Sequence, residues 1–154
     1  MIIEFSKNEL LFDIKNKSHS EVSVIPDAEA RYKIEAGGEK TDELERDLIT
    51  ATSMLNPHIS RYLVSDFRCH ADNGAGLPEI LIFEFSLSER RLDGKVQPLT
   101  DAIHAFLVDC TLGLFYGSVS NVELQKKRTE MAAVDAQLIE RLIYTKRPPY
   151  MTRN

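Results

Sequence analysis

The sequence predicts a mainly helical protein, a bundle of about four helices with one antiparallel β-hairpin. Several segments repeat apolar residues at helical spacing, and only one segment alternates apolar with polar residues as a strand does. The chain has 154 residues, of which 43% are hydrophobic and 28% charged, as in an average globular domain. We therefore expect one domain over residues 1–145, with the hairpin at about 63–88 and a basic tail at 146–154.

Capping signals predict where the first two helices start. Ser6 and Glu9 have the spacing of a capping box, which places a first helix over about residues 7–17. Asp27 is expected to cap a short second helix that ends near Ala36, before two glycines.

Between the first two helices, residues 22–26 are expected to be extended. A longer third helix is expected after Thr41, which we predict to be its cap. Pro57 removes one backbone donor and should kink or restart the third helix. The apolar stripe of this helix consists of Leu44, Leu48, Ala51 and Leu55.

One strand is predicted immediately after a glycine-containing loop at residues 70–78. Its apolar residues fall on a single face, and its expected antiparallel partner is Leu63–Cys69. A two-stranded ribbon is marginal alone, so it must lean on a helix or pair with another chain through its open edges. The apolar face of the strand consists of Leu81, Phe83, Phe85 and Leu87.

The segment Ala102–Tyr116, in a helix expected to begin near Pro98, is apolar on nearly all sides. It is shorter than the roughly 20 residues of a membrane span, and it contains His104 and Asp109, which are costly in lipid. We predict that it is the central core helix and that it leaves one face uncovered for a subunit contact. The candidate partner-binding residues on it are Phe106, Phe115 and Tyr116.

A final helix is expected from the capping box at 120–123 to about Tyr144, and Pro148-Pro149 should stop it. The basic, proline-stiffened tail that follows has two alternative interpretations. It docks to an acidic neighbour, or it is a frayed terminus. Its candidate partner-binding residues are Lys146, Arg147, Tyr150 and Arg153.

Charge is unevenly distributed along the chain. Residues 119–154 contain seven Lys/Arg and four Asp/Glu, a net +3, whereas residues 1–118 carry −8. An acidic body argues against nucleic acid as the main partner, because phosphate binding needs a concentrated positive face. An acidic body with a basic end suits head-to-tail contact between copies.

No catalytic residue, metal site or cofactor is predicted. Cys69, His70 and Asp72 lie close in sequence, as do His104, Asp109 and Cys110, but neither group has the paired-cysteine spacing of a zinc site. The two cysteines form no disulfide framework, which suits a reducing compartment. We expect a cytoplasmic or virion protein that is not an enzyme and does not bind a membrane. A zinc-dependent enzyme built on the 69–72 loop remains a third alternative.

The order of these elements resembles that of small prophage-encoded structural proteins. The resemblance is carried by Asp47–Tyr62, Pro78–Leu87, residues 103–108 and Leu142–Pro148. The architecture is also similar to that of phage head–tail connector proteins, which are helical bundles with a hairpin arm that assemble as rings. This chain departs from the pattern in having Phe115-Tyr116 where tryptophan is common.

The resemblance implies a phage-derived assembly protein, such as a head–tail connector or a neck or tail adaptor, that self-associates. Its implied partners are other copies of itself and other phage or mobile-element proteins. The alternative is a non-catalytic protein-binding or regulatory module of a mobile element.

Overall fold

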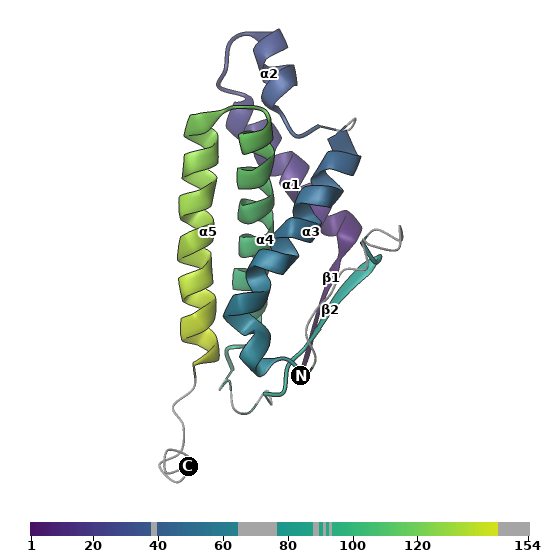
Figure 1. The fold of residues 1–154 in the computed structure, drawn as a ribbon, viewed down its shortest axis with the longest axis vertical. Coiled ribbons are helices and arrows are strands. Elements are labelled where there is room, and N and C mark those ends of the chain that lie inside the picture. Colours follow the sequence, from purple (N-terminus) through teal and green to yellow (C-terminus); the bar gives the residue numbers. More distant parts are fainter. Residues whose placement is uncertain (38–39, 65–76, 88–89, 91, 93, 145–154) are drawn as a thin grey trace.

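The computed structural model describes residues 1–37, 40–64, 77–87, 90, 92 and 94–144 (Figure 1). It confirms the predicted class, a mainly helical chain with one two-stranded antiparallel sheet. The elements are β1 (Ile2–Ser6), α1 (Lys7–Val22), α2 (Ala28–Ile34), α3 (Thr41–Ile59), a 3₁₀ turn (Ser60–Tyr62), β2 (Ile80–Glu84), α4 (Val96–Ser118) and α5 (Val122–Ile143).

Helix α4 is the centre of the fold and packs against α1, α3 and α5. Figure 1 shows α4 and α5 side by side as an antiparallel pair, with α3 crossing α4 obliquely and α2 at one end of the bundle. The sheet lies beside α1 and α3, and β1 leads directly into α1. The core therefore lies between the helices and the inner face of the sheet.

The caps of the first two helices are where the sequence predicts them. The hydroxyl of Ser6 accepts a hydrogen bond from the Glu9 amide at 3.4 Å, and Asp27 accepts from the Glu29 amide at 3.0 Å. Helix α1 extends beyond the predicted end to Val22 because Ser18 and Val22 continue its buried face. The expectation that extended chain begins at residue 22 was therefore wrong.

Helix α3 begins at Thr41 itself, one residue earlier than predicted, so Thr41 is not its N-cap. The Thr41 hydroxyl accepts a hydrogen bond from Lys15 at 2.9 Å, and the N-cap position, Lys40, makes no side-chain cap. Pro57 lies inside the last turn, and the helix ends two residues later in the 3₁₀ turn. Similarly, Asn121 caps α5 by accepting from the Leu124 amide at 3.1 Å, whereas Ser120 adopts a φ of 60°.

The predicted strand is present, but its main partner differs from the one expected. Strand β2 pairs antiparallel with β1, in a register that places Ile3 opposite Phe83. Of the expected partner Leu63–Cys69, Leu63 forms a single antiparallel bridge to Phe85, and residues 65–69 lie outside the described residues. The β1 segment was missed because it is short and runs straight into a capping signal.

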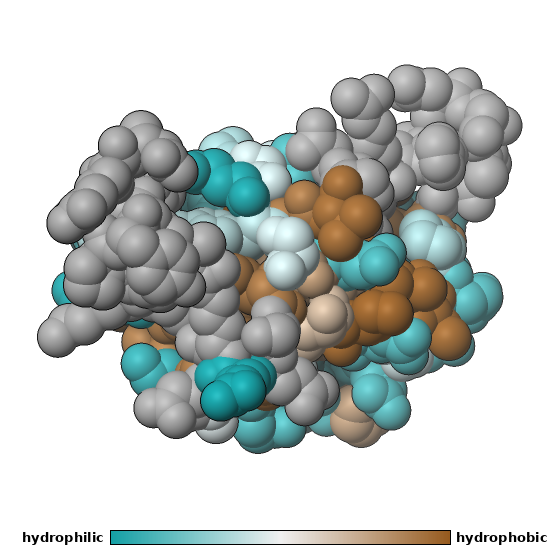
Figure 2. All heavy atoms as spheres, turned by 90° about the horizontal axis from the view of Figure 1, so that it is seen from below, coloured by the Kyte–Doolittle hydropathy of each residue, from teal (hydrophilic) through white to brown (hydrophobic). Residues whose placement is uncertain are grey.

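The inner face of the sheet is the one that the alternation predicts, since Leu81, Phe83, Phe85 and Leu87 are all buried. On the outer face, Ile2, Ile80 and Ile82 are about half exposed. Seen from below, the molecule shows hydrophobic surface interrupted by hydrophilic residues (Figure 2).

Candidate functional site

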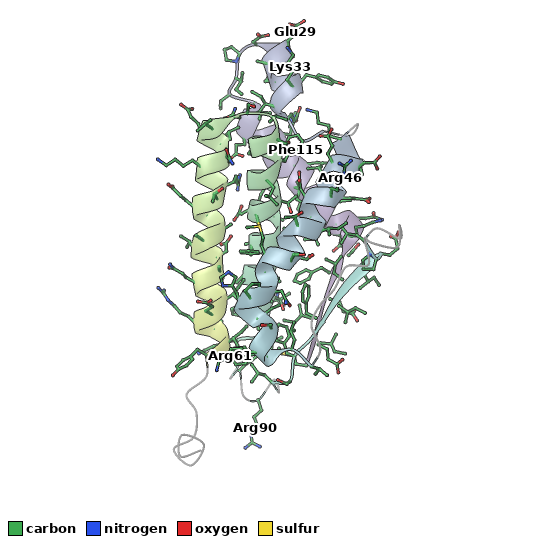
Figure 3. All side chains as sticks on the ribbon, viewed as in Figure 1. Glu29, Lys33, Arg46, Arg61, Arg90 and Phe115 are labelled. Atoms are coloured by element: carbon green, nitrogen blue, oxygen red, sulfur yellow. The ribbon has the colours of Figure 1, made fainter. Side chains whose placement is uncertain are left out.

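The apolar helix α4 is enclosed within a single copy of the chain. The side chains of Phe115 and Tyr116 are 0% exposed, and Figure 3 shows Phe115 inside the bundle. The expectation that Phe115 and Tyr116 lie on a face left uncovered for a subunit contact is therefore wrong. Among the described residues, α4 is also the one helix long and apolar enough to cross a membrane, and 72% of its most apolar window is buried in the fold.

The other predicted partner-binding residues lie either at a surface groove or outside the described residues. Phe106 is also buried, at 4% exposure, but its ring forms part of the floor of a surface groove. Lys146, Arg147, Tyr150 and Arg153 lie outside the described residues.

This groove runs between α3 and α5 over the surface of α4, and we call it the α3–α5 groove. Its volume is about 540 Å³, within the range of ligand pockets, which are concave and mostly apolar with a few polar groups. Phe106, Cys110 and Leu114 of α4 form its floor, and small residues of α5 form one wall: Ala132, Ala133 and Ala136.

The groove is closed at one end by a contact between its two walls. His58 of α3 and Glu140 of α5 meet at 2.8 Å between Nδ1 and Oε1. The His58 ring also packs edge-on against Phe106, with centroids 6.0 Å apart. Because α3 crosses α4 obliquely, α3 and α5 diverge from this point and leave the groove open towards the N-terminus of α3 (Figure 1).

Two sulfur atoms lie side by side in the groove. Cys110 Sγ is 3.7 Å from Met54 Sδ. Burial, together with the negative charges of Asp109 and Asp47, raises the pKa of the Cys110 thiol to about 11. Because the nucleophilic form of cysteine is the thiolate, this thiol is unreactive at neutral pH.

A second hollow lies beyond the open end of the groove, nearer the N-terminus of α3. Glu43, Arg46 and Asp47 of α3 line it, together with Ser118 and Val119. Burial and the neighbouring charge of Glu43 raise the pKa of Asp47 to about 6, although Arg46 acts in the other direction. Asp47 is therefore about half ionised near pH 6 and mostly ionised at neutral pH.

The other flank of α5, which faces α1, is held by a network of buried charges. Arg128 donates to Asp109 of α4 at 2.7 Å and to Glu21 of α1 at 3.1 Å, and it is 6% exposed. Burial alone would raise the pKa of Glu21, but the hydrogen bond and charge of Arg128 lower it overall. The guanidinium thus joins three helices.

Asp135 completes this network. Burial, and the hydrogen bond and charge of Asp109, raise the pKa of Asp135 to about 7. Its Oδ2 atom is buried and has no hydrogen-bond partner among the described residues. A protonated Asp135 can donate to Asp109, whereas an ionised one faces a second carboxylate.

The described residues contain no group of three or more His, Cys, Asp or Glu side chains that could hold a metal ion. The structure separates the 104–110 candidates, because His104 pairs with Asp13 at 2.8 Å, Asp109 pairs with Arg128 and Cys110 faces the groove. His70 and its neighbours Cys69 and Asp72 lie outside the described residues.

Sequence reasoning missed most of the groove. Met54 and His58 lie four residues apart on one flank of α3, whereas Ala132 and Ala136 belong to the buried face of α5 and Ala133 lies beside it. These spacings show that each set shares a face of its helix. They do not show that α3 diverges from α5, which depends on the crossing angle over α4. Comparison of the chain with protein-family models, with curated proteins and with solved structures gave no match.

Proposed function

We propose that this protein is a non-catalytic assembly protein that binds an apolar segment of a protein partner in the α3–α5 groove. The observation that carries the proposal is the groove itself, an apolar trough of about 540 Å³ with one closed end. Apolar segments of partners dock into troughs of this kind between helices.

The chemistry of the lining favours binding over catalysis. The thiol in the groove is held protonated by burial, and the histidine at its closed end is already paired with Glu140. The remaining lining is mainly apolar or uncharged, and the floor and α5 wall consist largely of aliphatic, aromatic and alanine side chains. Such a surface discriminates partners by shape and apolar area.

The resemblance to prophage-encoded structural proteins and head–tail connectors supplies the setting of the proposal, which is assembly of a phage-derived particle. In that setting the partner is another virion or mobile-element protein, or a further copy of this chain. Self-association is then expected through the groove, because the groove floor is where apolar side chains of α4 can be reached from outside.

Selection of peptides tests the proposal without knowledge of the partner. A library of random 12-residue peptides is displayed and selected on the immobilised full chain. It is then counter-selected on Ala133→Trp, in which an exposed alanine of the groove wall is replaced by a side chain large enough to fill the groove. We expect peptides with an apolar centre that bind the unmodified chain and not the variant.

The matched control is Val134→Trp. Val134 is the next residue of the same helix, is 63% exposed, and does not line the groove. Peptides that lose binding to both variants equally, or a selection that yields no peptide sensitive to Ala133→Trp, would count against the proposed function.

A further inference from the structure

We propose that the segment bound in the α3–α5 groove is the basic tail, residues 146–153, of a second copy of the chain, so that copies join head to tail. This inference rests on the proposed function, since it names the partner of the same groove. Three properties of the described residues carry it: the length of the groove, the placement of its charges and the point at which α5 ends.

The length of the tail matches the length of the groove. The groove runs along α5 from Gln125 to Glu140, which corresponds to about 22 Å at the rise of an α-helix. The eight residues 146–153 span about 26 Å when extended. Arg147 precedes two prolines, and this sequence favours an extended backbone.

The order of charged and apolar groups also matches. The groove has Glu140, paired with His58, at its closed end and apolar side chains in the middle. Beyond its open end, Glu43 and Asp47 outnumber Arg46 in the second hollow. The tail has Lys146-Arg147 at one end, Tyr150-Met151 in the middle and Arg153 at the other end, with no acidic residue. Each basic group can therefore lie beside a carboxylate while the tyrosine and methionine cover the apolar floor.

The position at which α5 ends favours binding of the tail in the groove of a second copy over binding in the chain's own groove. Glu140 lies at the closed end of the groove, and α5 ends only three residues later at Ile143. To enter its own groove, the chain would have to reverse direction before the stiff Arg147-Pro148-Pro149 segment. A groove on another copy requires no reversal.

Two variants that each retain one half of the contact provide the test. A chain that lacks residues 146–154 keeps the groove, and full-length Ala133→Trp keeps the tail. Light scattering of the unmodified chain should show a mean mass that rises with concentration through the micromolar range. Each variant alone should remain monomeric, and an equimolar mixture of the two should form a heterodimer and nothing larger.

If the mixture of the two variants stays monomeric while full-length Val134→Trp still assembles, the tail is not the occupant of the groove. Peptides that bind the groove in the display experiment would then leave the proposed function intact with another partner. An unmodified chain that is monomeric, whose groove becomes available to peptide only after deletion of 146–154, would show that the tail fills its own groove. That result would overturn contact between copies.

The contact should also weaken with salt, because it includes pairs of exposed opposite charges. Raising the ionic strength from roughly 0.05 M to 0.5 M should reduce the heterodimer fraction. A heterodimer fraction that is unchanged or that increases would show that opposite charges do not contribute to the contact, and the choice of the tail as occupant depends on them.

Discussion

The two flanks of α5 are held to the bundle in different ways. On the flank that faces α1, Arg128 is buried and bonded to carboxylates of α1 and α4. On the flank that faces α3, the helices touch through His58 and Glu140 and then diverge, which leaves the α3–α5 groove. One flank of α5 is held to the bundle by buried ion pairs, and the other borders an open apolar groove.

The difference shows which part of the fold is fixed and which is available. A buried ion pair is sensitive to the loss of either partner, because the remaining charge stays desolvated. A substitution on the exposed wall of an open groove costs little stability, because it removes little buried contact. Substitutions on the α1 flank should therefore affect stability, and substitutions on the α3 flank should affect binding.

The largest expected effect follows from removing the guanidinium of the closed flank. Arg128→Met leaves Glu21 and Asp109 buried without their main cation, so we expect the free energy of unfolding in urea to fall by about 3–5 kcal/mol. Arg128→Lys, which keeps the charge but not the forked geometry, should lose less.

Arg141→Met is the matched control, because Arg141 lies on the same helix and is exposed. Its free energy of unfolding should change by less than about 0.5 kcal/mol. Equal losses in Arg128→Met and Arg141→Met would mean that the buried network does not hold α5.

The next effect is a dependence of stability on pH. The pKa of Asp135 is raised to about 7 in the fold, so the folded chain binds a proton that the unfolded chain releases near the ordinary pKa of aspartate. The contribution of this group to stability is therefore present at low pH and is lost as the pH rises through about 7. Asp47, whose pKa is raised to about 6, contributes with the same sign.

Asp135→Asn should remove the part of this decline that belongs to Asp135. The amide can donate to Asp109 at every pH, as the protonated acid does. The free energy of unfolding in urea, measured at a series of pH values between 5 and 8, should fall less steeply with pH for Asp135→Asn than for the unmodified chain. At pH 8 the variant should be the more stable of the two. Parallel curves for the two proteins would contradict the assignment.

The smallest effect concerns two glycines of α4 that face α5. A Cβ on Gly117 would meet the end of the Gln125 side chain at 2.8 Å, and a Cβ on Gly113 would meet Thr129 Oγ1 at 3.2 Å. Gln125 is exposed and free to move, so Gly117→Ala should gain about 0.5 kcal/mol from helix propensity.

Gly113→Ala should gain less, because its Cβ would lie 3.2 Å from Thr129 Oγ1 and the short, β-branched threonine side chain has fewer ways to move aside than Gln125. Thermal unfolding of the two variants tests this order. A higher melting temperature for Gly113→Ala than for Gly117→Ala would contradict the contacts that the structure gives these two glycines.

Much of the fold follows from local sequence signals. Ser6 and Asp27 were predicted as caps because a short polar side chain satisfies the free amides of the first turn, and the strand face of Leu81 and Phe83 follows from simple alternation. The pairing of β1 with β2 joins segments about 80 residues apart. No local pattern specifies such a contact.

The candidate site was harder to predict because it depends on the angle between helices. Phe115 and Tyr116 were assigned to a partner on the basis of the apolar character of α4, but α1, α3 and α5 together cover that helix. The groove depends on α3 crossing obliquely, and the sequence of Met54 and His58 carries no information about that angle. The excess of basic residues in the tail, by contrast, is read directly from the sequence.

The most direct measurement is the binding of a labelled peptide with the sequence of residues 144–154 to the chain that lacks 146–154, followed by fluorescence anisotropy. We expect saturable binding that Val134→Trp leaves unchanged and that Ala133→Trp weakens at least about tenfold, since filling the groove forces the peptide out. Equal affinity for the two tryptophan variants, or no saturation, would contradict the claim that the open flank of α5 is where copies of this protein meet.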